Sequence, residues 1–405
     1  MSASRVYLDH AATTPVRPEV VDVVAAQLRS LGNPSSLHSS GRAARKVVEE
    51  SRESVAAAIG ARPSEVVFTS GGTEADNLAV KGLFWARRAA DSHQVRILAA
   101  AVEHHAVLDP VDWLGKAGGA EVEWLPVDSA GRLDVGAYTA ALDRDPGSVA
   151  LVSVMWANNE VGTLEPVRAV VDAARVHGVP VHSDAVQAVG SVPVHFGDSG
   201  LDAMTISGHK VGGPVGSGAL VVRRETELVP VLHGGGQERE IRSGTLDVAS
   251  IAGLATAVTA AVAEQAETAA RLTVLRDELV AGVRAAVPNV IVNGPDDERE
   301  RLPGIVHLSF PGCEGDSLVM LLDAQGIDCS MGSACAAGVP EPSHVLLAMG
   351  ADPLLARSSL RLSFGHSSSP SDVAAFRAAI GPVVERARAA GYLTVPNALP
   401  GGKDS

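Results

Sequence analysis

The sequence contains few lysines and few cysteines for its length of 405 residues. The lysines are Lys46, Lys81, Lys116, Lys210 and Lys403, and the cysteines are Cys313, Cys329 and Cys335. Three cysteines do not form the disulfide framework of small extracellular domains, and they fit a reducing compartment better. A lysine inside a motif is therefore conspicuous, and the odd cysteine in a glycine-rich segment is a candidate nucleophile.

Long apolar runs and an excess of positive charge are also absent. We find no run of 18 apolar residues, and the first ten residues lack a charged segment followed by an apolar one. The formal net charge is −14, so the basic surface expected of an autonomous nucleic-acid-binding protein is missing. We expect a cytoplasmic protein with an acidic surface, no membrane association and no direct nucleic-acid partner.

Short apolar runs alternate with helical patterns from about residue 63 to 223. The runs cover residues 65–69, 96–100, 121–127, 148–155, 179–183, 201–206 and 219–222. Strands that are apolar nearly throughout are typical of sheets covered on both faces, and the intervening helices indicate crossover connections. The pattern predicts an α/β large domain with a mostly parallel sheet flanked by helices.

Beyond residue 247, the order of predicted strands and helices changes. Residues 248–287 are rich in alanine and predict a helix or broken helix that leaves the first domain. Apolar runs at 290–292, 305–310, 327–329 and 358–363, with helices from about residues 314 and 371, then predict a smaller α+β unit. We expect a large domain over residues 15–260 and a small domain made of residues 1–14 and 261–405.

Lys210 follows a strand that ends in the small and polar residues 207–209 (Ser-Gly-His), and Asp184 and Gln187 follow the preceding strand. Ligands bind at the carboxyl ends of parallel strands. Pyridoxal phosphate needs a lysine for its Schiff base and an acid beside its pyridine nitrogen, because a protonated ring acts as an electron sink. A solvated loop lysine and a buried, helix-capping aspartate are the alternatives at this stage.

Two further segments follow strands. Residues 69–74 (Thr-Ser-Gly-Gly-Thr-Glu) precede a helix, so backbone N–H groups and the Thr73 hydroxyl are available to a phosphate, although an ordinary turn is possible. Residues 103–105 (Glu-His-His) place an imidazole where it can stack on a flat cofactor. They lack the i, i+4 spacing of zinc motifs, so we expect no metal site.

In this order, the motifs resemble those of the cysteine desulfurases of the NifS/IscS type, which are fold type I pyridoxal-phosphate enzymes of the class V aminotransferase family. The matching stretches are 7–15, 32–36, 69–77, 103–109, 158–162, 182–187, 207–210, 233–245, 332–335 and 358–364. The resemblance implies a homodimer that converts L-cysteine to L-alanine and leaves a persulfide. It also implies a sulfur-acceptor protein, such as an iron–sulfur scaffold or a tRNA-thiolation enzyme.

The resemblance implies a role for each residue that would contact the cofactor ring. Lys210 would form the Schiff base, and it would then take the proton from the substrate Cα. Asp184 would pair with the pyridine nitrogen, and Gln187 and Asn159 would contact the ring substituents. His104 would stack on the ring and accept the proton of the substrate thiol.

Other matching residues would hold the phosphate. The resemblance implies that Gly72, Thr73, Ser207 and His209 bind it within one subunit. Thr245 would reach the same phosphate from the other subunit, which is why we expect an obligate dimer.

A third group of matching residues would bind the substrate and accept its sulfur. The resemblance implies that Arg361 clamps the substrate carboxylate with help from Asn33, and a bidentate guanidinium suits that task. Cys335, in a catalytic loop at about residues 330–342, would accept the sulfur as a thiolate, and the small residues around it suit a mobile loop. Cys329 and Cys313 read as core cysteines.

Three other functions stay open. A selenocysteine lyase would use the same residues, and another fold type I lyase or aminotransferase would use Lys210 without Cys335. A non-catalytic scaffold for iron–sulfur assembly is a different class of protein. The combination of Lys210, Asp184 and Cys335 in one chain argues against the scaffold.

Overall fold

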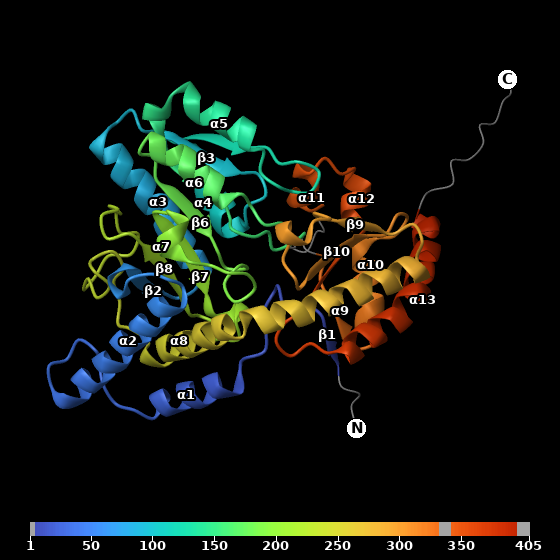
Figure 1. Cartoon of the computed structure of the whole chain (residues 1–405), viewed down its shortest axis with the longest axis horizontal. Helices are drawn as coiled ribbons and strands as arrows, with labels where there is room; N and C mark the ends of the chain where they lie inside the picture. Colours follow the sequence, from blue (N-terminus) through green and yellow to red (C-terminus); the bar gives the residue numbers. More distant parts are fainter. Residues whose placement is uncertain (1–4, 332–341, 395–405) are drawn as a thin grey trace, which may run out of the picture.

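A computed structural model of this chain describes residues 5–331 and 342–394 (Figure 1). Its largest sheet has the order β2-β8-β7-β6-β5-β3-β4, and only β8 runs antiparallel to its neighbours. The strands are β2 (Val66–Thr69), β3 (Arg96–Ala100), β4 (Glu121–Leu125), β5 (Val149–Ser153), β6 (Val181–Asp184), β7 (Ala203–Ser207) and β8 (Gly218–Val222). The prediction of a mostly parallel sheet is therefore confirmed.

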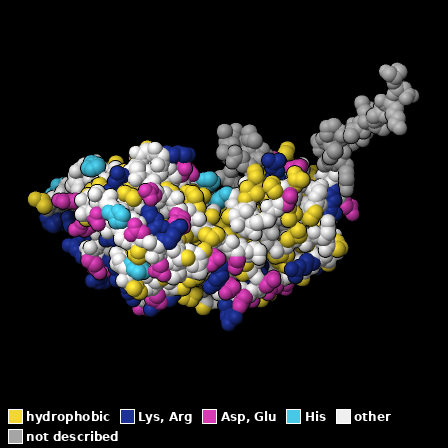
Figure 2. All heavy atoms as spheres, turned by 90° about the horizontal axis from the view of Figure 1, so that it is seen from above, with side chains coloured by type: hydrophobic (Ala, Val, Ile, Leu, Met, Phe, Trp, Pro, Cys, Tyr) yellow, Lys and Arg dark blue, Asp and Glu magenta, His cyan; other side chains and the backbone are white. Residues whose placement is uncertain are grey.

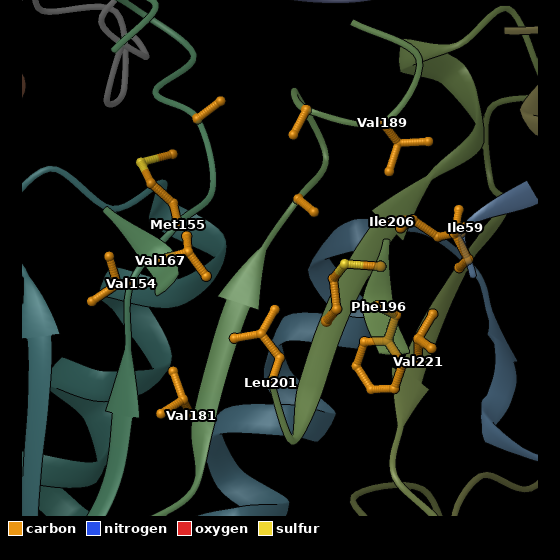
Figure 3. Packing of buried hydrophobic residues seen from close by; sticks show 14 of the residues in the cluster. Ile59, Val154, Met155, Val167, Val181, Val189, Phe196, Leu201, Ile206 and Val221 are labelled. Carbon is orange, nitrogen blue, oxygen red and sulfur yellow. The ribbon is translucent and has the colours of Figure 1, made fainter. Parts of the chain in front are cut away.

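Helices cover both faces of this sheet, as expected for strands that are apolar on both sides. On one face, α3 (Gly72–Ala90) and α4 (His105–Trp113) pack on the strands through a cluster that includes Leu83 and Val111. The other face carries α2 (Ser39–Ala58), α6 (Val167–Val176) and α8 (Val248–Ala263). Figure 3 shows part of that second cluster, where Phe196, Ile206 and Val221 are buried together.

The remaining elements complete this part of the chain. They are α1 (Pro18–Leu28), which packs on α8, together with α5 (Val135–Arg144) and the short α7 (Phe196–Ser199). Helix α1 begins with proline at its first position, where a missing N–H does no harm. Helix α5 begins after Asp134, whose carboxylate accepts a hydrogen bond from the backbone of Ala137.

The alanine-rich stretch forms two helices, α8 and α9 (Gln265–Ala286), with a 69° bend between them. Of the two alternatives predicted for this stretch, a helix or a broken helix, the structure shows the broken helix. Among the described helices, no single one is long and apolar enough to cross a membrane, and only this bent pair meets the criterion jointly. Figure 2 shows positively and negatively charged side chains interspersed over one face of the molecule.

Helix α9 leads into a smaller α+β unit (Figure 1). Its three-stranded antiparallel sheet has the order β12-β10-β9, formed by β9 (Ile291–Asn293), β10 (Ile305–Ser309) and β12 (Ser359–Ser363). Its other elements are α10 (Gly315–Asp323), β11 (Ile327–Asp328), α11 (His344–Ala348), α12 (Pro353–Arg357) and α13 (Pro370–Thr394). A separate apolar cluster that includes Phe310, Leu318 and Phe376 joins them. The domain boundary near residue 261 stays a prediction.

The N-terminal segment, residues 8–14, joins the two parts of the molecule. It follows β1 (Val6–Tyr7), which pairs with β11 in the small unit. The backbone N–H of Ala11 donates to the hydroxyl of Ser363 at 2.7 Å, and the N–H of Thr14 donates to the carbonyl of His209 at 3.0 Å. Residues 8–14 therefore lie between the small sheet and the carboxyl end of β7.

Candidate active site

A cavity of about 420 Å³ lies where strands β5, β6 and β7 of the large sheet end. Most of the predicted site residues line it: Gly72, Thr73, His104, Asn159, Asp184, Gln187, Ser207, His209, Lys210 and Arg361. A larger cavity of about 570 Å³ lies at the opposite edge of the sheet, beside the start of β6, and contains none of them. The smaller cavity is therefore the candidate active site, in agreement with the rule that parallel sheets bind ligands at their carboxyl edge.

Lys210 follows β7, and its amine points toward the N-terminal segment. Its Nζ donates hydrogen bonds to the carbonyl oxygens of Ala11 and Ala12, the second at 2.8 Å. Burial and the nearby Arg361 guanidinium lower the pKa of Lys210 to about 8. A larger share of its amine is therefore neutral near pH 7 than for an exposed lysine, and a neutral amine is the form that acts as nucleophile or base.

Asp184 is the last residue of β6 and is almost fully buried. Its Oδ1 accepts a hydrogen bond from the backbone N–H of Val186 at 2.8 Å. Burial and the neighbouring Asp76 raise the pKa of Asp184 to about 8. A protonated pyridine nitrogen beside this carboxyl group would stabilise its ionised form, so the position fits the predicted pairing.

A buried polar cluster lies behind Asp184. The ring of His182, two residues earlier on β6, contacts the hydroxyls of Ser153 at 2.9 Å and Thr205 at 3.1 Å. Its Nε2 is also 3.4 Å from a carboxylate oxygen of Asp76. Neither oxygen of Asp76 has a hydrogen-bond partner within the described residues, and burial raises its pKa to about 7. Sequence reasoning missed Asp76, which lies one helical turn beyond Thr73 in the matching stretch 69–77.

We expect Asp76→Asn to flatten the pH dependence of stability in the cofactor-free protein. The folded protein keeps the Asp76 proton up to about pH 7, whereas the unfolded chain releases it above about pH 4, so wild type loses stability as the pH rises between these values. The asparagine variant lacks this loss, which is on the order of 3 kcal/mol. Urea unfolding at pH 4.5 and pH 8 measures the difference. Parallel pH dependences in the two proteins would contradict the raised pKa.

His104 has a structural role as well as its predicted one. It precedes α4, and its Nδ1 accepts a hydrogen bond from the backbone N–H of Ala106 at 3.1 Å, which orients the ring. Burial and the charge of Lys210 lower the pKa of His104 to about 4, so the ring is neutral with its proton on Nε2. A neutral, oriented ring suits stacking, whereas the proton-acceptor role requires the pKa to rise when substrate binds.

The predicted phosphate site combines a helix start with an unpaired hydroxyl. Helix α3 begins at Gly72 without any side-chain cap, so its first N–H groups are free of side-chain acceptors. The buried Oγ of Ser207 has no hydrogen-bond partner within residues 5–331 and 342–394. A Cβ on Gly72 would lie 3.2 Å from a Val186 methyl group and fill part of the cavity floor. These features fit a bound phosphate, with Thr73 and His209 beside it.

Arg361 lies on β12 of the small sheet and reaches into the cavity. Its guanidinium donates from Nη1 to the carbonyl of Asn159 at 3.2 Å and from Nη2 to the carboxylate of Asp9 at 2.8 Å. Gln187 donates from Nε2 to the carbonyl of Ala11 at 2.9 Å. The N-terminal segment therefore contacts both side chains, and sequence reasoning gave Asp9 and Ala11 no role.

Two of the predicted residues do not line the cavity. Thr245 is exposed, and Asn33 is exposed with its side-chain oxygen bonded to the N–H of Ser35 at 2.9 Å. Cys335 lies outside the described residues. Of the other cysteines, Cys313 is buried, and burial raises the pKa of Cys329 to about 12, which makes its thiolate scarce at neutral pH.

Comparison with known proteins agrees with this geometry. The family model described as aminotransferase class-V matches residues 6–376. An IscS-like cysteine desulfurase from Mycobacterium tuberculosis is 58% identical over 95% of this chain and 97% of its own length. A cysteine desulfurase IscS from Dictyoglomus turgidum is 43% identical over 91% of both chains. A solved NifS-like protein superposes with a TM-score of 0.87 at 34% identity, over 94% of this chain and 100% of its own. The chain belongs to the class V aminotransferase family and, within it, to the pyridoxal-phosphate-dependent cysteine desulfurases of the NifS/IscS type.

Proposed function

We propose that this protein is a cysteine desulfurase that converts L-cysteine to L-alanine and holds the sulfur as a persulfide on Cys335. The observation that carries the proposal is a single cavity that joins Lys210, Asp184 and Arg361. The first two suit pyridoxal phosphate, and the third suits the carboxylate of an amino acid. Selenocysteine and aminotransferase chemistry would use the same three residues, but the relatives named as cysteine desulfurases favour cysteine.

Several residues of the cavity have distinct roles in the proposed reaction. When bound, the cofactor ring supplies an electron sink for the bonds around the substrate Cα. Arg361 binds the substrate carboxylate, and the Lys210 amine takes the proton from Cα. Asp184 would hold a negative charge beside the ring nitrogen, and His104 would stack on the ring.

Sulfur transfer requires a thiolate. The Cys335 thiolate attacks the substrate sulfur, so that an S–S bond forms while the carbon–sulfur bond of the substrate breaks. The electron pair of the broken bond stays with the carbon, which takes a proton and becomes the methyl group of alanine. The sulfur on Cys335 is then at the oxidation level of a persulfide, and an acceptor thiol can remove it.

A direct test measures both products. We expect the purified protein with added pyridoxal phosphate to form alanine and, with a reducing thiol present, sulfide in equal amounts from L-cysteine alone. The rate should not depend on any keto acid, which distinguishes a desulfurase from an aminotransferase. Alanine formation that requires a keto acid, or a rate with L-selenocysteine far above that with L-cysteine, would contradict the proposal.

The proposal extends to a cytoplasmic homodimer that delivers sulfur to an acceptor protein, such as an iron–sulfur scaffold or a tRNA-thiolation enzyme. Thr245 supports the dimer, because it is exposed here and does not line its own subunit's cavity. It lies close along the chain to Arg242, which forms a 2.7 Å ion pair with Glu74 at the start of α3. A second subunit would place its Thr245 hydroxyl at the phosphate.

We expect mixed dimers of two inactive chains to regain activity. The two chains carry Lys210→Ala and Thr245→Ala. In a hybrid dimer both substitutions affect the same site, because the site of the Lys210→Ala chain would receive its Thr245 hydroxyl from the Thr245→Ala chain. A hybrid of these chains contains one intact site, so co-refolding should restore up to about a quarter of wild-type turnover for random pairing, since half of the dimers are hybrids with one working site. Subunit exchange is verified by mass spectrometry of differently tagged chains. Demonstrated exchange without recovered activity would contradict a shared site.

A further inference from the structure

Arg361 is almost fully buried, and among the described residues it forms an ion pair with a single carboxylate. Its side chain is 6% exposed, and its ion-pair partner is Asp9 at 2.8 Å from Nη2, with a side chain that is 20% exposed. A second hydrogen bond joins Nη1 to the carbonyl of Asn159. The buried Nε has no partner within the part of the chain that the structure describes. The guanidinium is thus held on two nitrogens and free on the third.

The backbone fixes the position of Asp9. Asp9 and Ser363 form a parallel bridge, and Ser363 lies two residues beyond Arg361 on the same strand, β12. The N–H of Ser363 donates to the carbonyl of Leu8 at 2.8 Å, and the hydroxyl of Tyr7 donates to the carbonyl of Asp9 at 3.1 Å. Asp9 therefore approaches Arg361 from an ordered stretch of chain, with little rotational freedom to lose.

The charges in the cavity make a nearby carboxylate necessary. Lys210 and Arg361 are both cations of this cavity, and the Arg361 charge disfavours the protonated form of Lys210. Asp184 lines the same cavity, but in the holoenzyme its negative charge would be paired with the ring nitrogen. Without Asp9, Arg361 would have no carboxylate in an ion pair with it among the described residues. A buried arginine without its counter-ion moves or loses its fixed orientation.

We propose that Asp9 is a positioning residue for substrate binding, which holds the Arg361 guanidinium in the orientation that meets the substrate carboxylate. The proposal rests on the proposed role of Arg361 in binding that carboxylate. The substrate need not displace Asp9, because a guanidinium has five N–H donors and these two contacts use only two of them. Asp9 touches neither the substrate nor the cofactor in this arrangement, so it acts through Arg361.

The experiment compares Asp9→Ala and Asp9→Asn with wild type in the holoenzyme. We expect Asp9→Ala to raise the KM for L-cysteine and the Kd for the product L-alanine by about tenfold or more, with kcat changed less than about threefold. Asp9→Asn keeps an oxygen that accepts the hydrogen bond and should raise both constants by only about threefold. Binding of L-alanine by calorimetry gives a value that does not depend on turnover.

Two controls separate positioning from general damage. Tyr7→Phe loosens the same segment, because the tyrosine hydroxyl donates to the carbonyls of Asp9 and Thr13, but it leaves the Asp9 carboxylate in place. It should stay near wild type. In an Arg361→Ala background, either Asp9 substitution should add no further loss, because the residue through which Asp9 acts is gone.

The outcomes are distinguishable. If Arg361→Ala leaves the KM and the L-alanine Kd unchanged, the proposed role of Arg361 fails, and the inference on Asp9 fails with it. If Arg361→Ala weakens binding but Asp9→Ala leaves it unchanged or tightens it, only the positioning role is wrong. A loss for Tyr7→Phe equal to that for Asp9→Ala, or a further loss in the Arg361→Ala background, would also overturn it. If Asp9→Ala does not fold, the same cycle is measured with Asp9→Asn.

Discussion

Cys335→Ser should lower alanine formation from L-cysteine by at least about a thousandfold while the protein still binds its cofactor and its substrate. Sulfur transfer needs a nucleophile that is ionised near neutral pH and can form an S–S bond, and a serine hydroxyl meets neither condition. The residues that bind the carboxylate and move the Cα proton, Arg361 and Lys210, are unchanged in this variant. We therefore expect a spectral change on adding cysteine, without turnover.

The other two cysteines provide matched controls. Cys329→Ser and Cys313→Ser should keep turnover within a few-fold of wild type, apart from the cost of placing a hydroxyl in an apolar site. Cys313 is buried, and burial raises the pKa of both thiols. Mass spectrometry of the protein after one turnover locates the added sulfur atom. Persulfide found chiefly on Cys329 or Cys313, or full alanine production by Cys335→Ser, would contradict the assignment of Cys335 as the sulfur acceptor.

Lys210→Ala should remove the visible absorbance of the bound cofactor and lower kcat by at least about a thousandfold. The variant loses the covalent attachment to the cofactor and the base for the Cα proton, and a positioned base alone contributes about 10²–10⁴-fold. Burial of Lys210 lowers its pKa to about 8, so pH 7 to 8 is the range in which the wild-type amine becomes available. Absorbance after dialysis and a single-turnover assay measure the two effects separately.

A lysine elsewhere on the chain serves as the control for Lys210. Lys116 is 76% exposed and forms an ion pair with Asp112 one helical turn away, so Lys116→Ala should leave absorbance and turnover unchanged. Circular dichroism establishes that Lys210→Ala is folded. Retention of the wild-type spectrum and turnover by Lys210→Ala, once loosely bound cofactor has been removed, would refute the assignment.

The sequence predicted those strands and helices that a local pattern of apolar residues marks. The apolar run at 96–100 coincides with β3, whereas the run at 121–127 was too long, since β4 ends at Leu125 before Pro126, which has no N–H to donate. Strand β1 was not predicted, because two residues carry no periodicity. Its partner β11 is more than 300 residues away in the sequence, a separation that no local pattern reveals.

In the site, too, residues marked by a local pattern could be predicted, whereas contacts between distant parts of the sequence could not. Lys210 and Asp184 could be placed together because each follows a strand of one parallel sheet, and the carboxyl ends of such strands meet at one edge. Asp9 and Arg361 are 352 residues apart in the sequence, and only the folded chain brings them together. Asp76 lies in the matching stretch 69–77, whose glycines and threonine predicted a phosphate site. No pattern in the sequence indicated its contact with His182. The position of Cys335 relative to the cavity stays a prediction.

The capping hydrogen bond of His104 narrows the choice of residue at this position. Asparagine or serine could accept the N–H of Ala106 and start α4, but neither has a flat ring to lay on a cofactor. Phenylalanine or tryptophan could supply the ring, but neither could accept that N–H. Imidazole satisfies both demands at once. Tolerance to substitution at residue 104 should therefore be lower than either role alone would require, since a replacement that preserves one role abandons the other.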